Sequence, residues 1–203
     1  MDTSFVFATT ILLVMLMDPF GNLPVFLALL KGVPRERFYR IVLRESFFAL
    51  LAMLIALVTG RSFMKLMHIS PPVLGIAGGL ILLIMGIKMV FAGLHHEEVS
   101  HPGEQVLVPL AIPLICGPGL IAMLVTIRGS TPAATLLNCA WATIFAWIIQ
   151  TVILLSGKQI AAFLGVKLLD ALESLMGLLL SCIAVGMLID GINRIYGLTP
   201  PGL

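Results

Sequence analysis

Charged side chains are scarce in this sequence: Asp, Glu, Lys and Arg make up only 11% of its 203 residues. A soluble domain carries about 25% charged residues and about 45–50% apolar ones, whereas this chain is 60% hydrophobic. A chain of this length cannot hide so much apolar surface in one core, so lipid must be the solvent for much of it. The net charge of +2 is too small to indicate a nucleic-acid partner.

Cysteines and catalytic motifs are also sparse. The three cysteines, Cys116, Cys139 and Cys182, lie in apolar stretches without a Cys-x-x-Cys pair. We expect buried small side chains there, not a thiol–disulfide carrier. No Gly-x-Ser-x-Gly, His-Glu-x-x-His or phosphate-binding glycine loop occurs, so neither an enzyme nor a bound cofactor is expected. The N-terminus lacks the basic region of a cleaved signal peptide, so the first apolar stretch is expected to be a mature helix.

Long apolar stretches dominate what remains. A membrane-spanning helix needs roughly 20 mostly apolar residues, and no short segments of alternating polarity suggest a membrane strand. Six windows satisfy the helical pattern, at about 5–30, 42–60, 72–93, 107–128, 133–156 and 172–192. We predict an all-α integral membrane protein with six transmembrane helices, forming a single membrane domain over residues 1–203.

Basic residues near the helix ends predict the orientation. Eight lie in or beside the loops after the first, third and fifth helices, and four lie on the other side. The eight are Lys31, Arg35, Arg37, Arg40, Arg44, Lys88, Lys158 and Lys167. Because the richer side faces the cytoplasm, both termini are predicted on the periplasmic side of a bacterial inner membrane. Arg61 and Lys65 lie on the other side and favour the opposite orientation.

The two halves of the chain resemble each other. Matching positions are 98, 98 and 99 residues apart in the pairs Gly79/Gly177, Met89/Met187 and Pro19/Pro118. We predict two three-helix repeats, over residues 1–95 and 106–196. Because three is an odd number, the second repeat must be inverted in the membrane, as is typical of secondary transporters.

Helix-breaking residues recur at corresponding places in the two repeats. Asp18-Pro19-Phe20-Gly21-Asn22-Leu23-Pro24 interrupts the first apolar window, and Pro109, Pro113 and Gly117-Pro118-Gly119 interrupt the fourth. We expect the first and fourth helices to be discontinuous, although prolines that merely kink them are the alternative. Paired breaks at membrane depth indicate a binding site. Free N–H groups there suit a carboxylate, and free carbonyls suit an ammonium group or a cation.

Few charged residues lie within the apolar windows. Asp18 either caps the second half-helix or acts on an amine or a proton, and the two roles are compatible. Arg44 and Glu45, expected to open the second helix, either snorkel to the interface or form a gate or ion pair. Asp190 and Arg194 have the spacing of a structural i,i+4 pair.

One cluster is rich in metal-ligand side chains. His95, His96 and His101 occur with Glu97, Glu98 and Glu104 between the third and fourth windows. Pro102-Gly103 within this stretch argues against a rigid frame, and a metal site needs defined geometry. No metal site is therefore assigned, and whether the three histidines bind a metal is left open.

The two interrupted stretches resemble the signatures of a known family. The sequences of residues 18–24 and 112–119 are similar to the two signature stretches of the MarC family of six-helix inner-membrane proteins. Arg44-Glu45 and Asp190-Gly191 also resemble that family, and the resemblance runs from about residue 5 to 196.

The resemblance implies a function, because some members are regarded as transporters of small neutral amino acids such as glycine and alanine. It implies a substrate site with no catalytic residue, and coupling to H⁺ or Na⁺ is one option. The implied site residues are Asp18, Pro19, Gly21, Asn22, Pro24, Gly117, Pro118 and Gly119. A passive small-solute channel and a non-transporting membrane scaffold are the alternatives.

Overall fold

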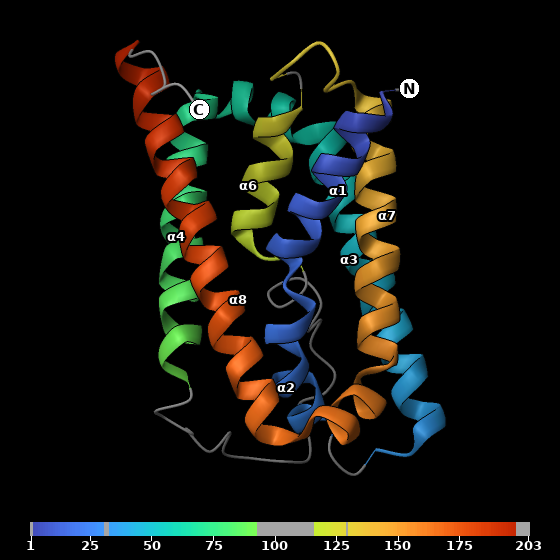
Figure 1. The fold of residues 1–203 in the computed structure, drawn as a ribbon. Coiled ribbons are helices and arrows are strands. Elements are labelled where there is room, and N and C mark those ends of the chain that lie inside the picture. Colours follow the sequence, from blue (N-terminus) through green and yellow to red (C-terminus); the bar gives the residue numbers. More distant parts are fainter. Residues whose placement is uncertain (1, 31–32, 93–115, 129, 198–203) are drawn as a thin grey trace.

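The protein is a bundle of long helices. The structure, a computed structural model, describes residues 2–30, 33–92, 116–128 and 130–197, and these contain helices and turns but no strand. In chain order the helices are α1 (Thr3–Met17), α2 (Pro19–Leu29), α3 (Arg35–Leu66), α4 (Pro71–Ala92), α6 (Pro118–Ile127), α7 (Leu136–Leu155) and α8 (Gly157–Tyr196). Figure 1 shows that α1 begins and α8 ends at the same end of the bundle, so both described termini lie on one side.

Five helical stretches in the described part of the chain are long and apolar enough to cross a membrane. They are Thr3–Leu23, Arg35–Leu66, Pro71–Phe91, Leu136–Leu155 and Leu168–Tyr196. The expected window at 107–128 lies partly outside the described residues, and α6 within it has 10 residues. The sixth transmembrane helix therefore stays a prediction.

Helix ends differ from the apolar windows in two places. Helix α3 begins at Arg35, so Arg44 and Glu45 lie inside the helix instead of opening it as predicted. Helix α8 begins at Gly157, directly after α7, and only Gly165, with φ 72° and ψ 166°, departs from helical geometry. The predicted apolar windows were shorter than the helices because a helix can continue through polar residues once it has left the hydrocarbon core of the membrane.

The outer surface of the bundle is apolar. Large hydrophobic side chains are exposed on every long helix, among them Phe47, Ile55, Leu80, Val152 and Leu178. Water-exposed apolar patches of this extent are rare in soluble monomers, so this surface fits lipid. Cys116 and Cys139 are buried as expected, but Cys182 is exposed, so the expectation of burial was wrong for that residue. An apolar window faces lipid on one side and protein on the other, and composition does not say which side a cysteine takes.

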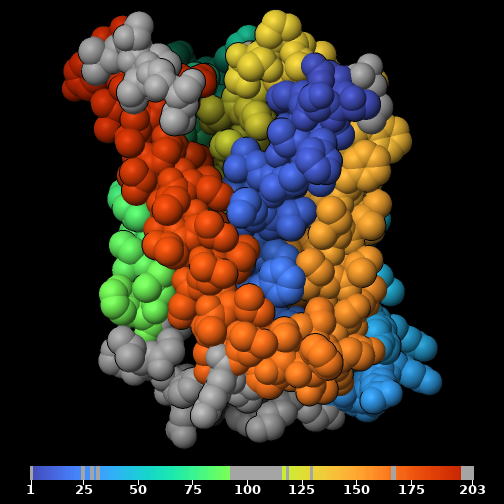
Figure 2. All heavy atoms as spheres, viewed as in Figure 1, coloured from blue at the N-terminus to red at the C-terminus, as the bar shows by residue number. Residues whose placement is uncertain are grey.

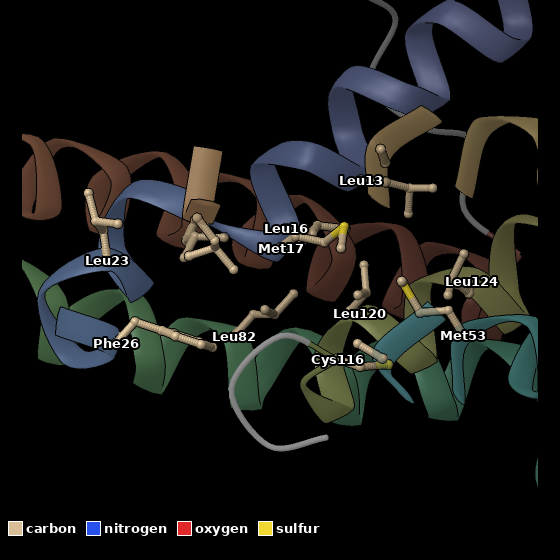
Figure 3. Packing of buried hydrophobic residues seen from close by; sticks show 14 of the residues in the cluster. Leu13, Leu16, Met17, Leu23, Phe26, Met53, Leu82, Cys116, Leu120 and Leu124 are labelled. Carbon is tan, nitrogen blue, oxygen red and sulfur yellow. The ribbon is translucent and has the colours of Figure 1, made fainter. Parts of the chain in front are cut away.

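Small residues let α4 and α8 approach closely along their length. A Cβ atom at Gly86 would lie 2.7 Å from the carbonyl oxygen of Gly177, and one at Gly177 would lie 2.7 Å from that of Gly86. Such close approach of backbones is the usual basis of helix packing in membranes. Helix α7 packs against α1 and α3, while α6 and α2 pack on α4 and α8 respectively. The described core lies between these helices (Figure 3).

Candidate functional site

Asp18 separates α1 from α2. Its backbone is left-handed, with φ 45° and ψ 67°, and its N–H donates to the Val14 carbonyl at 3.0 Å as the last bond of α1. Aspartate is among the few residues other than glycine that adopt this conformation readily. Helix α2 resumes at Pro19, which needs no N–H partner at a first helical position.

Side chains at and after the break form hydrogen bonds with free backbone groups at both half-helix ends. The Asp18 side-chain Oδ1 accepts a hydrogen bond from the Gly21 N–H at 3.0 Å. The Asn22 side-chain Nδ2 donates to the Met17 carbonyl at 2.8 Å, which serves the C-terminus of α1. Asp18, only 4% exposed, therefore caps α2, and Asn22 caps α1. Pro24 lies within α2.

A buried amide from α7 reaches the same carbonyl. Gln150 has no exposed surface, and its Nε2 donates to the Met17 oxygen at 3.5 Å. Its Oε1 and the neighbouring Thr151 hydroxyl are buried without a hydrogen-bond partner in the described part of the chain. Since nearly all buried polar atoms in proteins are paired, the Gln150 Oε1, on the amide that reaches the Met17 carbonyl, marks a place where a donor from a ligand would be stabilised.

A second carboxylate lies near the break. Glu173 lies one helical turn before Gly177 of α8, and an added Cβ atom at Gly177 or at Gly21 would meet the same Met89 side chain. Neither Glu173 nor Gln150 was predicted from the sequence. Both lie in predicted apolar windows, Glu173 in 172–192 and Gln150 in 133–156, and a survey of every polar residue in the windows would have found them.

The start of α6 falls at the second predicted break. Gly117 has extended geometry, with φ −61° and ψ 160°, Pro118 begins α6, and no side chain caps the helix. The Ile121 N–H bonds to the Gly117 carbonyl at 3.2 Å. The N–H groups of Gly119 and Leu120 precede that first bond, and the described residues offer them no side-chain acceptor. The predicted half-helix before residue 116 lies outside the described residues.

The α1–α2 break and the start of α6 both lie beside α4. A Cβ atom at Gly21 would overlap Met89, and one at Gly119 would overlap Leu82. Leu82 and Met89 are two helical turns apart, which is about 10 Å. Met17, from the first break, and Cys116 and Leu120, from the second, belong to one buried cluster with Leu82. Figure 3 shows these side chains close together in the packed core, so the structure brings the α1–α2 break and the start of α6 together.

The remaining predicted residues lie elsewhere. Arg44 and Glu45 form an ion pair with an Nη2–Oε1 distance of 2.8 Å, in which the Arg44 side chain is 51% exposed and that of Glu45 4%. The spacing of Asp190 and Arg194 correctly indicated an ion pair, which has an Nε–Oδ2 distance of 3.0 Å. His95, His96 and His101, with Pro109 and Pro113, fall outside the described residues. No cluster of metal ligands occurs among the residues that are described.

Long apolar helices and an apolar outer surface define a multi-span integral membrane protein. Comparison with known proteins gives the family. The model of the MarC family integral membrane proteins matches residues 3–196, and the chain belongs to that family. No solved structure matches it.

Three relatives are representative of the matching proteins. The UPF0056 inner membrane protein YhgN of Escherichia coli is 36% identical over 190 residues, which is 93% of this chain and 96% of that protein. The UPF0056 membrane protein BU449 of Buchnera aphidicola is 37% identical over 189 residues, with the same coverage. A UPF0056 membrane protein of Chlamydia muridarum is 32% identical over 196 residues, 95% of each chain.

Proposed function

We propose that the chain is an inner-membrane secondary transporter of small neutral amino acids, glycine and alanine first, which bind near the midplane between the two helix breaks. The location follows the E. coli relative, whose name describes an inner membrane protein. The observation that carries the proposal is the unpaired, fully buried Gln150 Oε1 beside the α1–α2 break. Residues of the second break pack in the same buried cluster as Met17, which ends α1.

The chemistry of the two breaks suits the two ends of a zwitterion. The ammonium group would donate to Gln150 Oε1 and to the Asp18 carboxylate. The carboxylate would accept from the N–H groups of Gly119 and Leu120, at the positive end of the α6 dipole. In this arrangement every charged ligand atom meets a buried group of opposite polarity.

The size and charge of the substrate follow from its neighbours. Gly21 and Gly119 are in such close contact with Met89 and Leu82 that no side chain fits at either glycine, which leaves little room for a large ligand. No Lys or Arg occurs within residues 2–30 or 116–127, so a substrate with a net negative charge is disfavoured. Glycine and alanine fit both limits.

Symmetric contacts support the inverted repeat that alternating access requires. A Cβ atom at Gly79 would lie 3.1 Å from the Met187 Cβ, and one at Gly177 would lie 2.7 Å from the Met89 Cβ. Adding 98 to Gly79 gives Gly177, and subtracting 98 from Met187 gives Met89, so each contact is the other's counterpart. Movement of one repeat against the other would open the site to each side in turn.

The interacting carboxylates of Asp18 and Glu173 are the groups best suited to carry H⁺ or Na⁺ with the substrate. The end of the bundle that holds Arg35, Arg37 and Arg40 would face the cytoplasm, with both described termini on the periplasmic side.

The experiment is thermal unfolding of the detergent-purified protein across a panel of amino acids, with and without sodium and at two pH values. A ligand that binds only the folded state raises the melting temperature. We expect a dose-dependent rise with glycine or alanine that is lost in Gln150→Leu. The matched control is Gln159→Leu, because Gln159 is an exposed glutamine at the start of α8. Wild-type ligand shifts in Gln150→Leu would contradict the proposed site.

A further inference from the structure

A separate cavity lies at the end of the bundle where α1 begins and α8 ends. It has a volume of about 400 Å³, is partly open to the outside, and is lined by residues of α4, α6 and α8, by Leu12 of α1 and by Ser130. None of the residues at the two breaks lines it. Figure 2 shows the face on which α8, in red, runs beside α1, in blue, with α6 between them toward this end. Its volume is within the range of small-molecule sites, about 300–1,000 Å³.

Two glycines line this space, the buried Gly75 and the exposed Gly186. Gly75 of α4 and Gly186 of α8 both line the cavity, and a Cβ atom built on either has no neighbour within 4 Å. This differs from the glycines at the α4–α8 contact, such as Gly79 and Gly86, where an added Cβ would come within 3.0 Å of a neighbouring atom. Gly75 is buried, so the open space beside it is the cavity itself.

The polar groups of the cavity carry both signs of charge. The Asp190–Arg194 ion pair uses one oxygen of the carboxylate and the Nε of the guanidinium, at 3.0 Å. The second carboxylate oxygen and the two Nη groups make no other bond within the described chain. Thr126 and Ser130 donate their hydroxyls to carbonyls of α6, each at 2.8 Å, which leaves both hydroxyl oxygens able to accept.

The rest of the wall is apolar, formed by side chains such as Met123, Ile127, Ile183 and Met187. Donors for an anion, acceptors for a cation and an apolar wall thus meet in one space. A ligand with only one charge would be attracted by one member of the ion pair and repelled by the other, whereas a zwitterion can interact favourably with both. Arg194 would bind a carboxylate through its free Nη groups, while Asp190 and the two hydroxyls would accept from an ammonium group.

We propose that this cavity is a second ligand site, distinct from the helix breaks, for a zwitterionic α-amino acid with an aliphatic side chain. The cavity has room for a larger side chain than the close-packed helix breaks do, and it has its own charged pair. The proposal goes beyond the transport function proposed above and stands independently of it, since neither Asp18 nor Gln150 contributes to the cavity.

Binding of radiolabelled L-leucine to the purified protein by equilibrium dialysis tests the proposal, with L-leucinamide and 4-methylpentanoate as competitors that each carry one charge. We expect saturable binding of leucine, weak competition by either analogue, and a loss of about tenfold in affinity in Asp190→Asn and in Arg194→Gln. Gly75→Leu and Gly186→Leu should abolish binding by filling the cavity. Ala77→Leu is the matched control, because Ala77 is exposed on α4 outside the cavity.

The readout separates this site from the proposed transport site. Leucine binding that survives in Gln150→Leu supports a second site even if no transport is found. Leucine binding that is absent in the wild type, unchanged in both glycine variants, or lost in Gln150→Leu would overturn the proposal. Leucine binding can also be compared in nanodiscs of two lipids, because the phosphatidylethanolamine headgroup is a zwitterion and that of phosphatidylglycerol is not. Leucine binding in phosphatidylglycerol nanodiscs but not in phosphatidylethanolamine nanodiscs would show that a lipid headgroup occupies the charged pair, and this result would overturn the proposal as well.

Discussion

The carboxylate of Asp18 accepts a hydrogen bond from the backbone N–H of Gly21 at 3.0 Å, three residues along the chain. This contact makes Asp18 the cap of α2, while its backbone ends α1. The residue is 4% exposed, so the charge is held inside the bundle instead of in water. A cap alone does not require a charge, because asparagine and serine serve as well.

Asp18→Asn should therefore separate the structural role from the functional one. Asparagine adopts the left-handed conformation and caps helices, so the melting temperature should change by no more than a few degrees. Uptake of glycine by proteoliposomes should fall by about tenfold or more, because the ammonium group loses its charged partner. Unimpaired uptake would show that Asp18 has no role in the mechanism, but it would not contradict the proposal that the protein is a transporter.

Gln150→Leu should abolish substrate binding without weakening the fold. Leucine has a similar volume and removes a buried oxygen that has no partner among the described residues, so the free energy of unfolding should stay within about 1 kcal/mol of the wild type. Chemical unfolding in detergent measures this change. A large loss of stability would show that Gln150 holds the fold together, and its place in the substrate site would then lack support.

The contact between α4 and α8 should depend on individual glycines. Gly177→Ala places a Cβ atom 2.7 Å from the Gly86 carbonyl, a backbone atom that cannot move aside alone. We expect a loss of about 1–3 kcal/mol in the free energy of unfolding. Gly186→Ala on the same helix is the control, since its Cβ has no neighbour within 4 Å. Equal effects of the two variants would contradict the close packing.

The Arg44–Glu45 pair should show coupling in a double-mutant cycle. Arg44→Ala removes the ion pair with the buried Glu45 carboxylate, which should cost about 1–3 kcal/mol because the arginine itself is 51% exposed. Glu45→Gln should cost less in the Arg44→Ala background than in the wild type, since the Arg44–Glu45 ion pair is already lost there. Additive effects of the two substitutions on the melting temperature would show that the pair contributes no coupling.

Orientation can be tested with reporters fused after Tyr196. Both described termini lie at the end of the bundle opposite Arg35, Arg37 and Arg40. Because the arginine-rich end should face the cytoplasm, an alkaline phosphatase fusion should be active and a green fluorescent protein fusion dark. The opposite result would reverse the predicted topology.

The sequence predicted the break in the first helix for a physical reason. Proline lacks an N–H and clashes with the preceding turn, so Asp18-Pro19 limits the backbone locally, whatever its neighbours are. The Gly117-Pro118 start of α6 follows the same logic. These features are local, and local chemistry can be read from a single chain.

The partners of the break could not be predicted in this way. Gln150 reaches Met17 from 133 residues away, and Glu173 acts on Asp18 from α8. In a chain whose helices are apolar on both the lipid and the protein side, hydrophobicity does not reveal which face turns inward. Whether these residues point into the bundle or toward lipid depends on how α1, α7 and α8 pack, and composition alone does not predict that packing.

Counterflow of radiolabelled glycine in proteoliposomes tests the central claim most directly. Vesicles loaded with excess unlabelled glycine should accumulate label transiently and saturably in the wild type and in Gln159→Leu. Asp18→Asn and Gln150→Leu should show little accumulation. Uptake without saturation would indicate a channel. No glycine or alanine counterflow by a folded wild-type protein, at any sodium concentration or pH tried, would contradict the account.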